Sequence, residues 1–317
     1  MFPSGNSKLN DCFEPGCLPV YQDIVQSKPE AIMEYKPLNN STLQEIWQAF
    51  NDAFSDYEVP IQMPFEKFQK MGKRRGLNLD ISLGAYEGKK LVGFVGNAAG
   101  DWNGKKTIYD CFTGIINDYK GKGLGKTLLE NSIIRSKELG FEQYLLEVIT
   151  TNEKAYKLYA SKGFKIVRNF DVYSSPCEKI RFSSAHLPDS DIKIIQTPDW
   201  KKFKRMWEFQ PSWQNSKESV ERAKDTFELF VIYRQNDCLG YLILDTETGD
   251  IPQFGIKKSH RRKDIASALL KKAAENRKKG FKLSLLNIDS DYKPFSCFMK
   301  KHKIPVIVKQ YEMICEL

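Results

Sequence analysis

The segment at residues 115–125, IINDYKGKGLG, most constrains how this chain folds. An apolar run typical of a β-strand breaks into a glycine-rich turn and then leads into LLENSIIRSKELG, whose apolar residues recur at helical spacing. Glycines at the start of a helix leave backbone N–H groups unshielded, and the helix dipole favours an anion there. The segment therefore predicts an α/β fold and a site for the phosphates of a ligand.

Two common nucleotide motifs do not fit this turn. The GKT at 125–127 resembles the end of a triphosphate-binding loop, but that loop needs a glycine five residues before Gly125, where Lys120 stands. The dinucleotide pattern GxGxxG fails as well, because its third glycine falls on Lys126 or on Leu128. The pattern that does fit is basic-x-x-Gly-x-Gly, which runs from Lys120 to Gly125.

The turn belongs to a regular order of predicted elements. Apolar periodicity, helix caps and turn residues predict the order β-α-α-β-β-β-α-β-α-β for the first half. The strands are expected at 32–36, 80–86, 91–98, 107–116, 143–149 and 163–167, and the helices at 41–54, 65–71, 124–139 and 152–159. The order then repeats, with strands at 192–195, 227–234, 238–244, 251–256 and 282–288 and a final pair of short strands, and helices at 199–207, 216–224, 264–278 and 294–301. Such a repeat indicates a duplicated fold.

A second motif follows the glycine turn. Residues 152–164 contain Asn-x-x-Ala-x-x-Leu-Tyr-x-x-x-Gly-Phe, and Asn152 and Tyr159 share a face of the predicted helix because they are seven positions apart. With both motifs and this order of elements, the first half resembles the GCN5-related N-acetyltransferases (GNAT). In that family the fourth strand runs into a (Gln/Arg)xxGx(Gly/Ala) turn that binds the pyrophosphate of acetyl-CoA.

The resemblance implies a fold class and a division into domains. The expected fold is α/β with a mixed sheet, as two tandem acyl-CoA N-acyltransferase (GNAT) folds. Residues 31–183 are expected to form a catalytic N-terminal domain, 184–190 a linker and 191–317 a degenerate C-terminal GNAT-like domain. Residues 1–30 show neither helical nor strand periodicity and are expected to form a loosely ordered leader.

The resemblance also implies how acetyl-CoA is held as a cosubstrate. The fourth strand contacts the pantetheine through its backbone, the glycine turn binds the pyrophosphate, and the Asn of the second motif contacts the cofactor. The expected cofactor-binding residues are therefore Ile115, Ile116, Lys120, Gly121, Lys122, Gly123, Leu124, Gly125, Lys126 and Asn152. Lys120 departs from the family's Arg or Gln but keeps a positive charge.

Acetyl transfer to an amine also needs a general acid and a general base. In the family, the Tyr of the second motif lies near the thioester sulfur, so Tyr159 is the expected acid. The expected base is Glu147, in a LeuGluVal sequence similar to that of ribosomal-protein N-terminal alanine acetyltransferases. Other members place the base on the fourth strand, where Asp110 is the second choice.

The second half retains less of this pattern. When LeuLeu at 269–270 is aligned with LeuLeu at 128–129, Arg261 takes the place of Lys120 and Asp264 that of Gly123, while Met299 takes the place of Tyr159. A carboxylate beside a diphosphate is unfavourable. We expect this half not to turn over acetyl-CoA, and to complete the substrate cleft or a homodimer surface instead.

Composition and charge constrain partners and location. Residues 191–317 hold 25 Lys and Arg against 17 Asp and Glu, so most of the net charge of +9 lies there. No nucleic-acid-binding motif accompanies the charge, and we expect the exposed face of a helix at 264–278 rather than a nucleic-acid site. The seven cysteines form no CxxC pair, so neither a metal site nor disulfides are expected, and without a membrane-spanning run or signal sequence we expect a cytoplasmic protein.

Two functions follow from the resemblance. The first is an acetyl-CoA-dependent N-acetyltransferase that transfers acetyl directly to a primary amine, either of a small molecule or of a peptide. The alternative is a non-catalytic acyl-CoA-binding or basic interaction protein on the same fold. The intact second motif favours catalysis, since a protein that only binds acyl-CoA has no need of the Tyr159 phenol.

Overall fold

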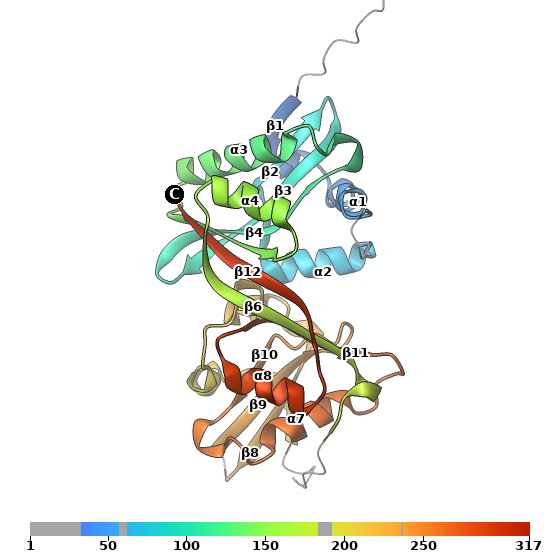
Figure 1. Ribbon diagram of the computed structural model, residues 1–317, viewed down its shortest axis with the longest axis vertical. Helices are drawn as coiled ribbons and strands as arrows, with labels where there is room; N and C mark the ends of the chain where they lie inside the picture. Colours follow the sequence, from blue (N-terminus) through green and yellow to red (C-terminus); the bar gives the residue numbers. More distant parts are fainter. Residues whose placement is uncertain (1–32, 57–61, 183–191, 236) are drawn as a thin grey trace, which may run out of the picture. The chain divides into compact units, whose positions relative to one another are not determined.

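The structure is a computed structural model that describes residues 33–56, 62–182, 192–235 and 237–317. The expected leader at 1–30 and linker at 184–190 lie outside the described residues. The first half contains β1 (Met33–Pro37), α1 (Leu43–Ala53), α2 (Phe65–Arg75), β2 (Leu77–Glu87), β3 (Lys90–Trp102), β4 (Lys105–Ile115), α3 (Leu124–Glu138), β5 (Gln143–Ile149), α4 (Glu153–Ser161) and β6 (Lys165–Pro176). The predicted order of elements is confirmed for this half (Figure 1).

The second half repeats the order with shorter helices. It contains β7 (Ile192–Ile195), α5 (Trp200–Phe203), α6 (Lys217–Arg222), β8 (Phe227–Arg234), β9 (Asp237–Asp245), β10 (Gln253–Ile256), α7 (Ile265–Ala274), β11 (Lys282–Asp289), α8 (Lys293–Lys301) and β12 (Val306–Glu316). The predicted final pair of short strands is wrong, because β12 is one strand of 11 residues. The helix expected at 264–278 ends at Ala274, since Glu275 already has extended backbone.

Local sequence explains where the helices of the first half begin and end. Thr42 caps α1 through a capping box, in which its side chain accepts from the Glu45 N–H while the Glu45 carboxylate accepts from the Thr42 N–H. Gly76 ends α2 in the left-handed conformation, with φ of +85°. Of the apolar residues expected to face inward on α3, Leu128 and Leu129 are buried, but the Ile134 side chain is 53% exposed.

Helices cover both faces of the first-half sheet. A Cβ on Gly93 of β3 would meet Ile115 and Leu128, so this position faces α3. The next residue, Phe94, packs on Phe50 of α1 with ring centroids 6.4 Å apart. Successive residues of a strand point to opposite faces, so α3 lies on one face of the sheet and α1 on the other.

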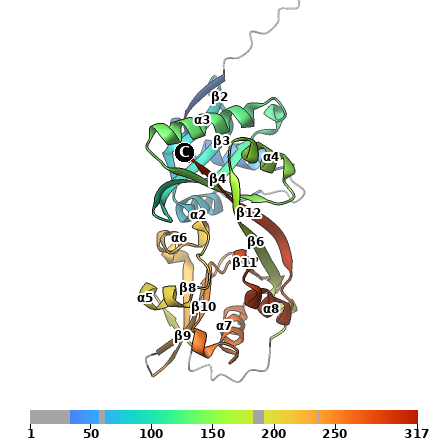
Figure 2. The ribbon, with the colours of Figure 1, turned by 60° about the vertical axis from the view of Figure 1, so that its left-hand side comes forward.

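The strands form two sheets, and the larger one contains strands from both halves. Its order is β1-β2-β3-β4-β5-β12-β6-β11, and the smaller sheet has the order β10-β9-β8-β7 (Figures 1 and 2). The C-terminal strand β12 lies between β5 and β6 and is antiparallel to both. The sheets therefore do not divide at the predicted linker, because the last strand of the second half completes the sheet of the first.

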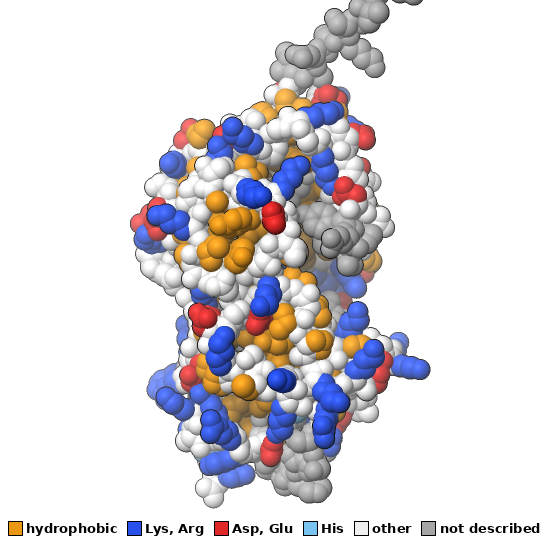
Figure 3. All heavy atoms as spheres, in the orientation of Figure 1, with side chains coloured by type: hydrophobic (Ala, Val, Ile, Leu, Met, Phe, Trp, Pro, Cys, Tyr) orange, Lys and Arg blue, Asp and Glu red, His pale blue; other side chains and the backbone are white. Residues whose placement is uncertain are grey.

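The second half also has its own apolar core. Ile265, Leu269, Leu270 and Ala273 of α7 are buried, while Lys271 is exposed. Lys and Arg side chains are spread over this half in Figure 3. None of the helices in the described ranges is long and apolar enough to cross a membrane.

Candidate active site

The glycine turn lies directly between β4 and α3. Gly121 and Gly123 have φ of +77° and +81°, a conformation that side chains rarely adopt, so glycine is favoured at both positions. A Cβ at either position would meet nothing within 4 Å, so the space above the turn is open. Among the described residues, no side chain caps the N-terminus of α3 at Gly123. The turn thus has the open, uncapped backbone that a diphosphate needs.

The lysines of the turn are placed differently from one another. Lys120 Nζ lies 2.5 Å from Asp56 Oδ1 and 2.8 Å from the Ala53 carbonyl, which ties the turn to the C-terminal end of α1. This hydrogen bond lowers the pKa of Asp56. Lys122 is exposed, with its ammonium 5.1 Å from the centre of the Tyr119 ring, and Lys126 is exposed on the first turn of α3. Positive charge therefore surrounds the turn, although Asp56 already compensates that of Lys120.

Two of the three apolar residues expected to bind the cofactor are buried, and the third is partly buried. Ile116 and Leu124 belong to the core, and Ile115 packs towards Gly93 and Gly125. Ile116 and Leu124 can therefore reach a cofactor only through their backbone, whereas Ile115 keeps part of its surface exposed.

The two central strands separate next to this turn. β4 and β5 run parallel and pair only over three residues, Thr107–Tyr109 with Gln143–Leu145. Beyond Tyr109 no further pair joins the two strands within the described part of the sheet, whereas β5 pairs with β12 along its whole length. Asp110 and Glu147 lie on the two strands just past the point of separation.

Glu147 is enclosed by residues from both halves of the chain. Its Oε2 accepts hydrogen bonds from Gln214 Nε2 at 2.6 Å and from the Tyr109 hydroxyl at 3.2 Å. Tyr109 stacks on Trp213, with ring centroids 5.0 Å apart. Arg75 donates to Gln214 Oε1 at 3.1 Å, so α2 holds the glutamine in place.

A second carboxylate lies directly opposite Glu147 on the neighbouring strand. Glu312 of β12 is its partner in the strand register and is buried, and Arg168 of β6 binds it with both ends of its guanidinium, at 2.6 and 2.7 Å. Burial, and next the charge of Glu312, raise the pKa of Glu147 to about 7, against a smaller opposing effect of Arg75. The predicted base thus has the pKa of a general base that works near neutral pH.

Asp110 has a similar environment on β4. It is buried, and its Oδ2 accepts from the Thr113 hydroxyl at 2.6 Å, while Oδ1 is buried without a hydrogen-bond partner in the structure. Burial raises the pKa of Asp110 to about 6. Two carboxylates with raised pKa values therefore lie at the separation of β4 and β5.

Asn152 and Tyr159 lie at the two ends of α4. Asn152 caps the helix, since its Oδ1 accepts from the Ala155 N–H at 3.1 Å. The half-buried Tyr159 ring packs on Phe164 at 5.7 Å, and Phe164 also contacts Tyr144 of β5 at 5.6 Å. Tyr144 and Glu147 are three positions apart on one strand and point to opposite faces of the sheet. Tyr159 and Glu147 are thus placed on opposite sides of β5.

The residues around Glu147 were not predicted from the sequence. Gln214 and Glu312 come from the second half, and Arg75 and Arg168 carry no motif. Glu312 is found only when β12 is known to lie beside β5, and Gln214 and Arg75 only when the packing of their segments against this sheet is known. The sequence gives no local signal for either. Among the described residues, no group of three or more His, Cys, Asp or Glu side chains is arranged to hold a metal ion.

The second half repeats the backbone of the glycine turn with other residues. Arg262 and Asp264 have φ of +58° and +56° at the positions that correspond to Gly121 and Gly123. Asp264 lies 3.1 Å from Lys301. The turn geometry is therefore kept, but a carboxylate now stands where the first half has open backbone.

Comparisons with known proteins agree with this geometry. A model of the acetyltransferase (GNAT) family matches residues 40–164. The structure is similar to a GCN5-related N-acetyltransferase from Sphaerobacter thermophilus, with a TM-score of 0.66 and 14% identity over 91% of this chain and 96% of that one. It is also similar to a tandem GNAT protein from the clavulanic acid biosynthesis pathway, with a TM-score of 0.67 and 12% identity over 90% of this chain and 98% of that one.

These matches identify the chain as a protein with a tandem GNAT fold. Residues 40–164 are similar in sequence to the acetyltransferase (GNAT) family. A mycothiol acetyltransferase from Propionibacterium freudenreichii is 34% identical over 95 residues, which make up 30% of this chain and 30% of that enzyme. The chain thus aligns with under a third of the length of this curated relative.

Proposed function

We propose that the first half of the chain transfers an acetyl group from acetyl-CoA to a primary amine. One observation carries the proposal: the open glycine turn at the start of α3 adjoins the separation of β4 and β5, where Glu147 has its pKa raised to about 7. A thioester held by its diphosphate at the turn reaches this separation along the unpaired edge of β4. Acetyl-CoA supplies the activated acyl group, and the residues of the chain supply its placement and the proton transfers.

Glu147 takes a proton from the ammonium form of the acceptor in this proposal. The amine nitrogen then forms a C–N bond with the thioester carbon, the C–S bond breaks, and the nitrogen loses its second proton to water, from which the phenol that has protonated the sulfur is restored. Gln214 and Tyr109 occupy Glu147 Oε2, whereas Oε1 is buried without a hydrogen-bond partner among the described residues, so we assign proton transfer to Oε1, through a water molecule. Tyr159, on the other side of β5, donates its phenolic proton to the departing sulfur.

The glycine turn binds the diphosphate through backbone N–H groups, supported by the charges of Lys122 and Lys126. Lys120 holds the turn against α1 through Asp56 and the Ala53 carbonyl. Asn152 orients α4 as its cap, and we assign it a further contact with the cofactor.

The test is a panel of amines scored by release of the free CoA thiol. The panel includes small primary amines, amino acids, an aminoglycoside and peptides with free N-termini. We expect saturable CoA release with at least one class, and its loss in the double variant Glu147→Gln/Tyr159→Phe. Tight acetyl-CoA binding with no release above the spontaneous hydrolysis rate for every acceptor would instead support the non-catalytic acyl-CoA-binding alternative.

A further inference from the structure

The second half encloses a cavity of about 860 Å³ between β10 and β11. These strands correspond to β4 and β5. Within the described residues they do not pair with each other, and a single bridge joins Asp250, just before β10, to Ser284 of β11. The cavity is within the range of about 300–1,000 Å³ that is typical of small-molecule sites. None of the residues to which we assign acetyl-CoA binding or proton transfer lines it, but Asn287, which does line it, hydrogen-bonds to Glu147.

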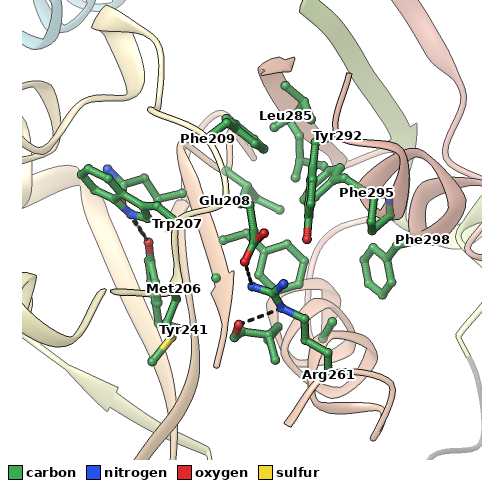
Figure 4. Close-up of a pocket in the computed structure, with 18 of the residues that line it drawn as sticks. Met206, Trp207, Glu208, Phe209, Tyr241, Arg261, Leu285, Tyr292, Phe295 and Phe298 are labelled. Carbon is green, nitrogen blue, oxygen red and sulfur yellow. Dashed lines mark hydrogen bonds and ion pairs between the residues drawn. The ribbon is translucent and has the colours of Figure 1, made fainter. Parts of the chain in front are cut away.

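One wall of the cavity is aromatic. Phe254 lies 5.8 Å from Phe298 and 6.3 Å from Phe295, measured between ring centroids, and Phe209 lies 5.7 Å from Tyr292. All five rings are only partly buried and line the cavity, so they leave apolar surface exposed to it. Phe209, Tyr292, Phe295 and Phe298 are labelled in Figure 4. Such a surface is stabilised by an apolar ring or chain that covers it.

A polar cluster faces this wall. Arg261 donates to Glu208 Oε1 at 2.5 Å and to the Ile256 carbonyl at 3.2 Å, and the hydroxyl of Tyr292 points towards this pair in Figure 4. The charged side chains that line the cavity are Arg261, Arg262, Lys293, Lys301, Glu208 and Asp264. Four are cationic and two anionic, so the lining has a positive balance that favours an anionic group on the ligand.

The same lining disfavours the diphosphate of acetyl-CoA. Asp264 occupies the position of Gly123, and its carboxylate lies 3.1 Å from Lys301, so this cation is already compensated. The Asp264 carboxylate would repel a diphosphate at this turn. Its side chain would also keep the diphosphate away from the backbone N–H groups. The cavity is therefore suited to a smaller anion attached to a large apolar group.

We propose that this cavity binds an apolar carboxylate, with the chain or ring of the ligand against the phenylalanines and its carboxylate at Arg261. The ligand carboxylate replaces Glu208 at Arg261 Nη2, while Arg261 Nε keeps its hydrogen bond to the Ile256 carbonyl. The cavity adjoins the proposed acetyl-transfer site at Asn287, but the proposal does not depend on the function assigned to that site.

The test is calorimetry on the full chain with decanoate, phenylbutyrate, decanol and acetyl-CoA. We expect one molecule of decanoate or of phenylbutyrate to bind per chain. Decanoate should bind if the cavity prefers an apolar chain, and phenylbutyrate if it prefers a ring. Affinity for the neutral decanol should be roughly tenfold weaker or more than for decanoate, since a charge-assisted hydrogen bond is lost. Acetyl-CoA should not displace the carboxylate.

Four variants separate the wall from the charge. Ala266→Phe places a ring in the cavity and should abolish binding, whereas Lys271→Phe places the same ring on the exposed face of α7 and should leave it unchanged. Arg261→Met should weaken carboxylate binding, while Glu208→Gln, which removes the competing carboxylate, should strengthen it. The proposal is overturned if neither carboxylate binds, if decanol binds as tightly as decanoate, if Ala266→Phe still binds, or if acetyl-CoA competes for the cavity.

Discussion

At Glu147, burial and a neighbouring carboxylate act on the pKa in the same direction. Burial penalises the charged form, and Glu312 repels it, so the carboxyl is divided between its two forms near neutral pH. Burial alone, without a neighbouring carboxylate, raises the pKa of Asp110 on the adjacent strand to about 6. The two groups differ enough in environment for their roles to be separated by substitution.

We predict that Glu147→Gln removes the acidic limb of the pH profile of kcat/KM. In the unchanged enzyme activity should rise with pH through about 7, because a base must be ionised to accept a proton. The variant should lose roughly 10²–10⁴-fold in kcat and become insensitive to pH in this region. Asp110→Asn is the comparison, and a limb that survives in Glu147→Gln but disappears in Asp110→Asn would assign the base to Asp110.

The same pKa also predicts how stability depends on pH. The folded pKa of Glu147 lies above the unfolded value, so its contribution to the free energy of unfolding is complete below about pH 4.5 and is lost as pH rises through about 7. A neutral glutamine has no such loss, so Glu147→Gln should gain stability relative to the unchanged protein between about pH 5 and 8, by on the order of 1–3 kcal/mol. Urea unfolding at several pH values measures it. A difference that stays constant with pH would contradict the raised pKa.

Tyr159 is predicted to act on the sulfur and not on binding. Tyr159→Phe keeps the ring that packs on Phe164 and removes only the hydroxyl. Turnover should fall roughly 10- to 1,000-fold while the Kd of acetyl-CoA stays the same. Tyr156→Phe is the matched control, because Tyr156 lies on the same helix but packs on Tyr311. Equal turnover in the unchanged protein and in Tyr159→Phe would show that Tyr159 is not the general acid.

Among the elements, the turn before α3 was predictable because its signal is local. Glycines at fixed spacing determine its backbone, and the structure shows the two left-handed residues at Gly121 and Gly123. The position of β12 was not predictable, since a strand pairs with whatever neighbour tertiary packing supplies. The hydrogen bond between Gln214 and Glu147 joins residues 67 positions apart, and the raised pKa of Glu147 results from that enclosure.

A further prediction concerns the glycine turn, for which the corresponding turn of the second half, with Asp264 at the position of Gly123, is a natural comparison. Gly123→Asp should abolish acetyl-CoA binding, because it places a carboxylate at the open backbone, while the fold is kept as it is at Asp264. Gly123→Asn, which tolerates the left-handed conformation without a charge, should weaken binding much less. Calorimetry with acetyl-CoA measures both.

The control for backbone strain is Gly140→Asp, at the other end of α3. Gly140 has φ of +75° and open space around it, but it lies away from the turn. The Kd of the Gly140→Asp variant for acetyl-CoA should match that of the unchanged protein. Equal loss of binding in Gly140→Asp and Gly123→Asp would show that strain in the helix, and not the added charge, is responsible.

In the whole molecule, β12 of the second half lies in the sheet of the first half, and its side chains therefore affect the proposed acetyl-transfer site. β12 brings Glu312 beside Glu147, and β6 brings Arg168 to Glu312, so a charge from the last strand of the chain adjusts a residue of the first half. Separate domains joined by a linker would not have this property. The tandem arrangement therefore places part of the control of the proposed acetyl-transfer site in the second half.

We predict that Glu312→Gln moves the acidic limb of the kcat/KM profile to lower pH. The substitution removes the repelling charge and leaves Arg168 without its carboxylate partner, and both effects favour the ionised form of Glu147. Glu316→Gln is the matched control, because Glu316 lies on the same strand in an exposed ion pair with Lys105. A limb at the same pH in Glu312→Gln, Glu316→Gln and the unchanged enzyme would show that β12 does not tune the base. A shift to higher pH would show that the loss of the buried ion pair disturbs the site more than the loss of repulsion helps it.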